Sequence, residues 1–129
     1  MKKLLLISVL VLISTNVMAE WSEIGKTDGY KIYVDLTTIR KVGERVKMWV
    51  LVDYSTAQIV GNIRPFLSRK DQSEYDCKEE LWRKHAAIIF PENMGKGEVI
   101  ISNGSVNGEW EAVSPSSGDK LLWNVACNK

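Results

Sequence analysis

The first twenty residues constrain this chain more than any other feature. Two lysines are followed by a ten-residue run, 4–13, that is apolar except for Ser8. Polar residues then interrupt the run, and Val17 and Ala19 place small side chains at −3 and −1 of a cut before Glu20. This is the layout of a secretory signal peptide, and the run is too short for a transmembrane helix, which needs about 20 apolar residues. We therefore expect residues 1–19 to be removed and the protein to be periplasmic or secreted to the cell surface.

The mature N-terminus is our first testable prediction. We expect N-terminal sequencing of the protein from its native source to begin at Glu20, because the processing enzyme prefers small residues at these two positions. No cysteine lies near the cut, so we expect no lipid there. Recovery of a chain that retains Met1, or of material confined to the cytosol, would contradict export.

Cleavage leaves 110 residues, enough for one domain, which we assign to 20–129. The loss of two lysines leaves 15 basic against 16 acidic residues, a formal charge of −1. This balance gives no electrostatic reason to expect a nucleic acid as partner. All five tryptophans remain, so the domain can build a substantial core.

Both cysteines, Cys77 and Cys127, survive cleavage into an oxidising compartment. The alternatives to a disulfide are two free thiols, a metal pair or a redox dithiol. A redox pair favours Cys-x-x-Cys spacing, and a structural zinc needs more ligands than two thiols and the single histidine supply. We predict a bridge, which removes about 4 kcal/mol of unfolded-chain entropy on the loop-closure model.

The remaining pattern predicts strands first and a helix last. Alternating or β-branched segments at 21–26, 30–35, 45–54 and 98–102 indicate strands, with a turn at 35–38. The strand at 45–54 is apolar on both faces and is therefore expected in the middle of a sheet.

The segments between these strands are less certain. Residues 64–77 are polar and predict a long, solvent-facing strand. Residues 79–90 fit a helix or a strand equally well; the strand would place Trp82, Ala86, Ile88 and Phe90 on one face.

A final helix is predicted from Gly118 to Cys127, capped by Ser116 or Ser117. Asp119 is favourable in its first turn because the helix N-terminus is electropositive. Three apolar side chains are expected to face the sheet, namely Leu121, Leu122 and Val125. The last turn would place Cys127 within reach of a strand at Cys77.

No residues form a catalytic constellation. His85 is the only histidine, and no ligand set or triad lies near it in sequence, so a structural or surface role is favoured. Asp76, Glu79 and Glu80 alternate with basic residues, which is typical of a solvated, salt-bridged face. The sequence therefore predicts no enzyme activity, no metal site and no cofactor.

A candidate protein-binding face lies within residues 64–84. This segment carries six basic side chains against five acidic ones. Mixed charge on an exposed strand mostly keeps sheet edges from pairing with other chains, and a polar protein-binding face is the alternative. The predicted binding residues are Arg64, Arg69, Lys70, Lys78, Arg83 and Lys84.

Several short motifs, taken in order, resemble the surface-adhesin protein E family of Gram-negative bacteria. The matching pieces are Trp21, Tyr33-Val34-Asp35 with Ile39, Val46-x-Met48-Trp49, Ser68-x-Lys70, Tyr75-Asp76-Cys77, Met94-Gly95-x-Gly97 with Val99, Trp110, Pro115-x-Ser117 and Cys127. The resemblance implies an α+β, mainly β fold: a curved antiparallel sheet of about six strands with a C-terminal helix tied to it by the disulfide. It also implies that 79–90 is a strand.

The functional implication of this resemblance is adhesion, because the family's namesake binds host matrix and plasma proteins. We therefore expect a non-catalytic protein-binding module whose partner is an envelope or host extracellular protein. The alternative is a periplasmic small-ligand or haem-binding protein that uses the concave side of the sheet and aromatic residues such as Tyr33 and Trp82.

Overall fold

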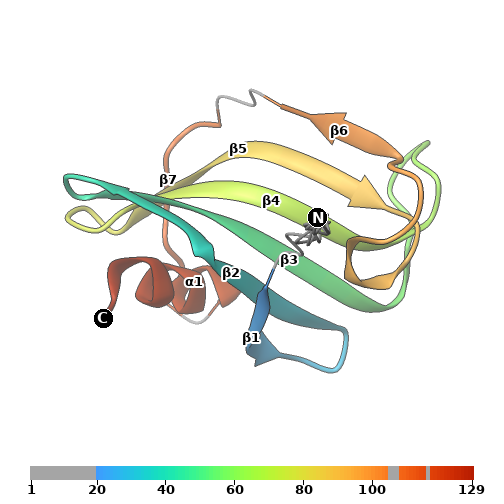
Figure 1. Cartoon of the computed structure of the whole chain (residues 1–129), viewed down its shortest axis with the longest axis horizontal. Coiled ribbons are helices and arrows are strands. Elements are labelled where there is room, and N and C mark those ends of the chain that lie inside the picture. Colours follow the sequence, from blue (N-terminus) through green and yellow to red (C-terminus); the bar gives the residue numbers. More distant parts are fainter. Residues whose placement is uncertain (1–19, 105–107, 116) are drawn as a thin grey trace, which may run out of the picture.

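The computed structural model describes residues 20–104, 108–115 and 117–129; the predicted signal peptide and the alternative helix cap Ser116 lie outside these ranges. The chain forms a meander of strands followed by a C-terminal helix (Figure 1). Its elements are β1 (Trp21–Lys26), β2 (Tyr30–Val42), β3 (Arg45–Gln58), β4 (Phe66–Asp76), β5 (Leu81–Phe90), η1 (Asn93–Gly95), β6 (Ile101–Asn103), β7 (Glu111–Ala112) and α1 (Gly118–Cys127).

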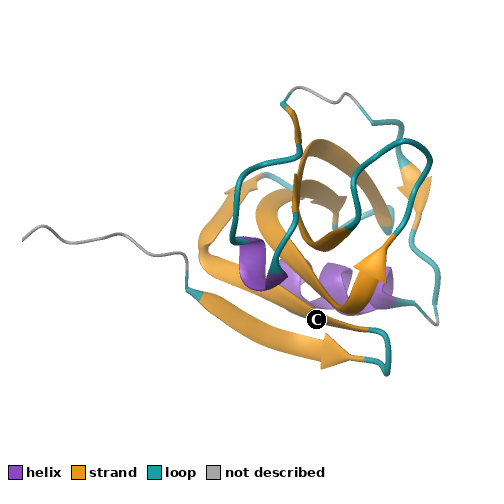
Figure 2. Cartoon of the chain, turned by 90° about the vertical axis from the view of Figure 1, so that its right-hand side faces the viewer, coloured by secondary structure: helices purple, strands orange, loops and turns teal. Residues whose placement is uncertain are grey.

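The strands form one antiparallel sheet in the order β1-β2-β3-β4-β5-β6, with the short β7 also paired to β5. Each strand from β1 to β6 therefore pairs with its neighbour in sequence, which is the simplest connection for antiparallel strands. Viewed end on, the sheet curls without closing and α1 packs against it (Figure 2). The predicted curved, mainly β fold with one C-terminal helix is confirmed.

β3 lies in the middle of the sheet, as predicted. Met48 and Val50 are buried on the face that carries α1, and Leu51 is buried on the opposite face. We call these the helix face and the helix-free face. β1 also forms as predicted, and a hairpin follows it in which the Thr27 N–H donates to the Tyr30 carbonyl at 2.8 Å.

The main core lies between the helix face and α1. The sheet contributes mainly branched apolar side chains, and α1 contributes Leu122, Trp123 and Ala126. Leu122 is buried as predicted, but Leu121 is 38% exposed. Trp123 takes the inward position instead because its indole N–H donates to the Asp76 carbonyl at 2.9 Å, which fixes the rotation of the helix.

Both ends of α1 are fixed. The Ser117 hydroxyl accepts from the Asp119 N–H at 3.2 Å, the predicted N-cap. At the other end, Cys127 forms the predicted disulfide with Cys77, the residue that follows β4. The bridge joins the end of the helix to the sheet across 50 residues of sequence.

The strand predicted within 64–77 is confirmed as β4, but the prediction that it faces solvent is wrong. β4 lies between β3 and β5, and Asp71, Ser73 and Glu74 are buried. Polar groups tolerate such burial when they are paired, and both carboxylates have basic partners. The acidic side chains of this strand are therefore buried in ion pairs and do not indicate a solvent-exposed face.

β2 runs through the turn predicted at 35–38. The expected turn chemistry is present, because Asp35 Oδ1 accepts from the Thr37 N–H at 3.0 Å. It produces a break in the register with β3 between Asp35 and Arg40, and the strand continues beyond it.

β5 confirms the strand assignment that the family resemblance implied for 79–90, although the predicted face is wrong. Gln72 pairs with Ala86 and Ser73 with Lys84, so His85 is an extra residue in β5. This β-bulge reverses the side-chain alternation. Trp82 consequently lies on the helix face, whereas Ala86, Ile88 and Phe90 lie on the helix-free face.

Candidate functional site

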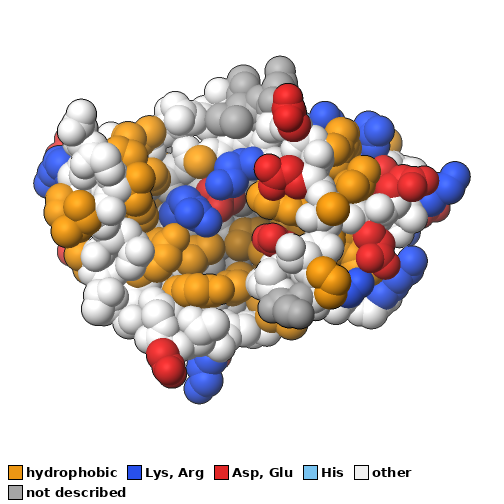
Figure 3. Space-filling model, turned by 180° about the vertical axis from the view of Figure 1, so that it is seen from behind, with side chains coloured by type: hydrophobic (Ala, Val, Ile, Leu, Met, Phe, Trp, Pro, Cys, Tyr) orange, Lys and Arg blue, Asp and Glu red, His pale blue; other side chains and the backbone are white. Residues whose placement is uncertain are grey.

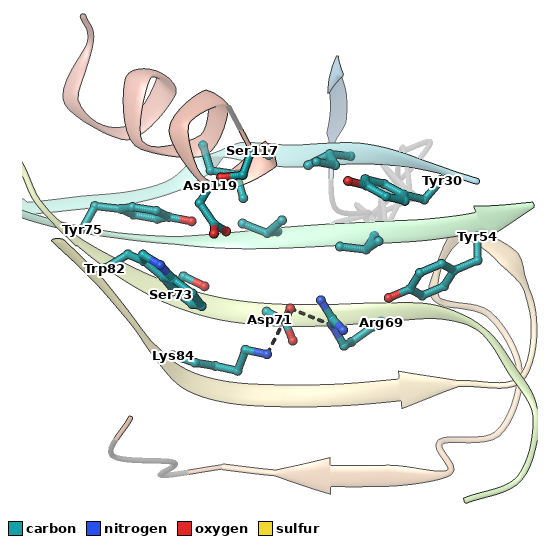
Figure 4. A pocket seen from close by; sticks show the side chains of 15 residues that line it. Tyr30, Tyr54, Arg69, Asp71, Ser73, Tyr75, Trp82, Lys84, Ser117 and Asp119 are labelled. Carbon is teal, nitrogen blue, oxygen red and sulfur yellow. Dashed lines mark hydrogen bonds and ion pairs between the residues drawn. The ribbon is translucent and has the colours of Figure 1, made fainter. Parts of the chain in front are cut away.

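A hollow of about 340 Å³ opens on the helix face, between the start of α1 and strands β2 to β5 (Figure 4). Tyr30 and Tyr54 lie at one end of it, and Tyr75 and Trp82 at the other. Seen from behind in Figure 3, basic and acidic side chains sit together in a depression bordered by hydrophobic ones. The hollow thus has a charged floor between aromatic ends.

The floor is built around the carboxylate of Asp71, which is 5% exposed. Arg69 Nε donates to Asp71 Oδ2 at 2.8 Å, and Lys84 Nζ lies 3.7 Å from the same oxygen. Asp71 Oδ1 is buried and has no hydrogen-bond partner among the described residues. An unpaired buried acceptor is unusual in a folded protein because it forfeits the hydrogen bonds it made in water.

Arg69 and Tyr75 keep fixed protonation states in this environment. Burial lowers the pKa of Arg69, but the attraction of Asp71 and Tyr54 outweighs it and the pKa is raised. Burial raises the pKa of Tyr75. The hollow therefore presents a permanent guanidinium on its floor and a neutral Tyr75 phenol at one end at physiological pH.

The wall opposite this floor comes from the first turn of α1. Ser117 and Asp119 lie at the hollow, and the Asp119 carboxylate points toward its interior (Figure 4). The lining thus carries two basic side chains, Arg69 and Lys84, and two acidic ones, Asp71 and Asp119. Its formal charge is balanced.

The helix-free face carries a different set of side chains. Trp21, Trp49 and Trp110 are all partly exposed. Trp21 and Trp49 line an open depression of about 270 Å³ together with Lys70. The Lys70 ammonium lies 5.6 Å from the Trp21 ring centroid and 5.0 Å from that of Phe90, which is within cation–π range.

Trp110 lies between two arginines. The guanidinium carbons of Arg45 and Arg83 lie 5.1 and 4.4 Å from its ring centroid. We refer to Trp21, Trp49, Lys70, Arg83 and Trp110 as the tryptophan surface. Sequence reasoning missed it because these side chains come from different strands and from the segment before β7.

Arg83 also belongs to a buried cluster. Glu74 Oε1 lies 2.7 Å from Arg83 Nη2 and 2.9 Å from His85 Nε2. Burial raises the pKa of Glu74, but the hydrogen bonds from His85 and Arg83 outweigh it and the pKa is lowered. His85, for which the sequence favoured a structural or surface role, is therefore a partner of Glu74. Among the described residues, no group of three or more His, Cys, Asp or Glu could hold a metal.

The predicted acidic face at 76–80 forms the turn between β4 and β5. Asp76 Oδ1 accepts from the N–H groups of Lys78 and Glu79, each at 3.0 Å. Glu80 lies 3.7 Å from Lys120 of α1. The carboxylates of Asp76 and Glu80 therefore stabilise the turn and its contact with α1.

The six basic residues proposed from the sequence do not lie together. Arg69 and Lys84 lie at the hollow, and Lys70 and Arg83 belong to the tryptophan surface. The other two, Arg64 and Lys78, are exposed in the loops that precede and follow β4.

The two aromatic residues named for a small-ligand site also separate. Trp82 lines the hollow. Tyr33 lies on the other face, because its neighbours Ile32 and Val34 both point into the helix-face core.

In the described part of the chain, no helix has the length and apolar character needed to cross a membrane.

Comparison with known proteins identifies the relatives of this chain. The family model for surface-adhesin protein E matches residues 21–128. Two structures of Haemophilus influenzae protein E share the fold. The one from a non-typeable strain is 14% identical and has a TM-score of 0.63, covering 88% of this chain and 79% of that one. Crystal form II is 13% identical and has a TM-score of 0.58, covering 81% and 91%. No curated protein sequence matches the chain.

Proposed function

We propose that this chain, which belongs to the surface-adhesin protein E family, binds an envelope or host extracellular protein through its tryptophan surface. The family supports an exported, adhesin-like surface protein. Export by cleavage before Glu20, and binding without catalysis, are parts of the same proposal.

The observation that carries this proposal is the exposure of three tryptophans on one face, two of them against basic side chains. Tryptophan and arginine are the residues most enriched among those that dominate protein–protein binding energy. The large ring of tryptophan buries much area at little entropic cost, and its polar edge tolerates water in the free protein. Three partly exposed tryptophan side chains on one face are therefore suited to binding a partner protein.

The position of the tryptophan surface also favours it over the helix face. α1 already covers the core of the helix face, whereas Trp21 and Trp49 are attached to strands and lie on the side without a helix. Strands hold side chains more rigidly than loops do, so little conformational freedom is lost on binding.

A pair of double variants tests this surface. Trp21→Ala/Trp110→Ala should lower the amount of partner captured from envelope or host extracts by about tenfold or more, because each such ring contributes on the order of 1–2 kcal/mol to binding. Quantitative pull-down with identification by mass spectrometry measures it. Circular dichroism should report a folded sheet in both variants.

Arg64→Ala/Lys78→Ala is the matched control, since both residues are exposed and lie outside the tryptophan surface. Capture should be close to that of the wild type. The proposal fails if the loop variant loses capture and the tryptophan variant keeps it. Turnover of an ester, peptide or glycan by the wild type would contradict the non-catalytic part.

A further inference from the structure

We infer that the hollow on the helix face is a binding site for a neutral saccharide. This inference goes beyond the proposed protein binding and does not depend on it, because the hollow and the tryptophan surface lie on opposite faces of the sheet. It stands on the size of the hollow, its aromatic ends and the arrangement of charge on its floor.

The size and the aromatic ends define the shape of the ligand. About 340 Å³ falls at the lower end of the range for small-ligand sites, about 300–1,000 Å³, and suits one or two sugar rings. Tyr30 and Tyr54 lie at one end and Trp82 at the other. Sugar rings carry apolar C–H faces and a polar perimeter, so aromatic side chains and a polar floor match different parts of the same molecule.

The charged side chains on the floor define which polar groups the ligand must carry. Asp71 Oδ1 has no hydrogen-bond partner among the described residues, so a ligand that reaches it once Lys84 moves aside can donate a hydrogen bond to it. The donor has to be uncharged, because Arg69 and Lys84 flank the carboxylate and would repel a cation.

A hydroxyl meets this requirement, and a second hydroxyl beside it can accept from the guanidinium of Arg69 or from the ammonium of Lys84. Among the described residues, the Lys84 ammonium is held by one 3.7 Å contact, so it can move to admit the ligand. An anionic ligand would instead face Asp71 and Asp119. Adjacent uncharged hydroxyls are the distinguishing chemistry of neutral sugars.

The test is a titration of the ¹⁵N-labelled protein with glucose, galactose, mannose, N-acetylglucosamine, maltose and lactose, followed by amide chemical shifts. We expect at least one of these to give saturable shifts at the amides of Arg69, Ser73 and Lys84. Binding of its methyl glycoside with equal affinity would assign the ligand to a glycan, and loss of binding would assign it to a free sugar. Glucuronate and the peptide Gly-Tyr-Gly serve as charged and peptidic competitors.

Trp82→Ala should lower the affinity for the sugar by about tenfold, which is the effect of losing one aromatic contact of roughly 1.4 kcal/mol. Trp49→Ala is the matched control, because it removes a partly exposed tryptophan from the opposite face and should leave the affinity unchanged. Lys84→Gln, at a partly exposed position, provides a second variant that should fold and bind several-fold more weakly.

The inference is overturned if no neutral sugar shifts these amides. It is also overturned if glucuronate or the peptide binds more tightly than every neutral sugar, or if Trp49→Ala abolishes binding while Trp82→Ala does not.

Discussion

Replacing Cys77 and Cys127 together by serine is expected to lower the free energy of unfolding by roughly 2–5 kcal/mol, the usual effect in a small secreted domain. The bridge closes 50 residues of sequence and joins the end of α1 to the sheet. Its loss enlarges the unfolded ensemble and releases a helix that contributes Leu122, Trp123 and Ala126 to the core. For a domain of this size, such a change is a large share of the total stability. Equilibrium urea unfolding measures it.

An alanine pair at the same two positions separates the bridge from side-chain polarity. Cys77 is buried, so a serine there adds a hydroxyl to an apolar site whereas an alanine does not. Both variants should approach the stability of the reduced wild type. Stoichiometric labelling of two thiols in the native, unreduced protein would show that the bridge is absent and would contradict the prediction.

Arg83→Ala is expected to lower the free energy of unfolding by about 2–4 kcal/mol, somewhat less than for a fully buried ion pair. Arg83 is 26% exposed, but its partner Glu74 is buried, and the substitution leaves that carboxylate with His85 as its remaining basic partner. Arg45→Ala is the matched control. Arg45 also lies against Trp110 but is exposed and does not contact Glu74, so its loss should change stability by only about 0.5 kcal/mol or less.

The same cluster predicts a pH dependence. The folded protein lowers the pKa of Glu74 below its ordinary value of 4.5, so its stabilising contribution is complete above that pH. The contribution is lost as the pH falls through the lower, folded-state pKa. Glu74→Gln should therefore be less stable than the wild type above pH 4.5 and should converge with it in more acidic solution. Parallel curves over the whole range would show that Glu74 carries no such linkage.

Local sequence signals were sufficient for the boundaries of several elements. β1 and α1 were predicted to the residue, because Trp21–Lys26 ends at a turn signal and Ser117 supplies an N-cap. β3 was placed mid-sheet from apolar residues on both of its faces. These features depend on neighbouring residues along the chain, which a sequence shows directly.

The interior of β4 could not be predicted in the same way. Its charged residues suggested exposure, yet Asp71 and Glu74 are buried because Lys84, Arg83 and His85 reach them from β5. Pairing of this kind depends on the register between two strands. A single bulge at His85 shifts this register, so that Lys84 pairs with Ser73 on the helix face and Arg83 with Glu74 on the helix-free face.

The candidate sites were missed for a related reason. The tryptophan surface joins β1, β3, β4, β5 and the segment before β7, and the hollow joins four strands to the first turn of α1. No regular spacing in the sequence predicts that the residues of the tryptophan surface, or those of the hollow, come together. The signal available was the high number of tryptophans, which indicated important aromatic side chains without locating them.

The attachment of α1 by its last residue has a consequence for the timing of activity. The helix is fastened at Cys127, while its opposite end supplies the wall of the hollow through Ser117 and Asp119. A precursor waiting in the reducing cytosol has two thiols in place of that fastening. We expect its helix to fray and the hollow to stay unformed until oxidation follows export.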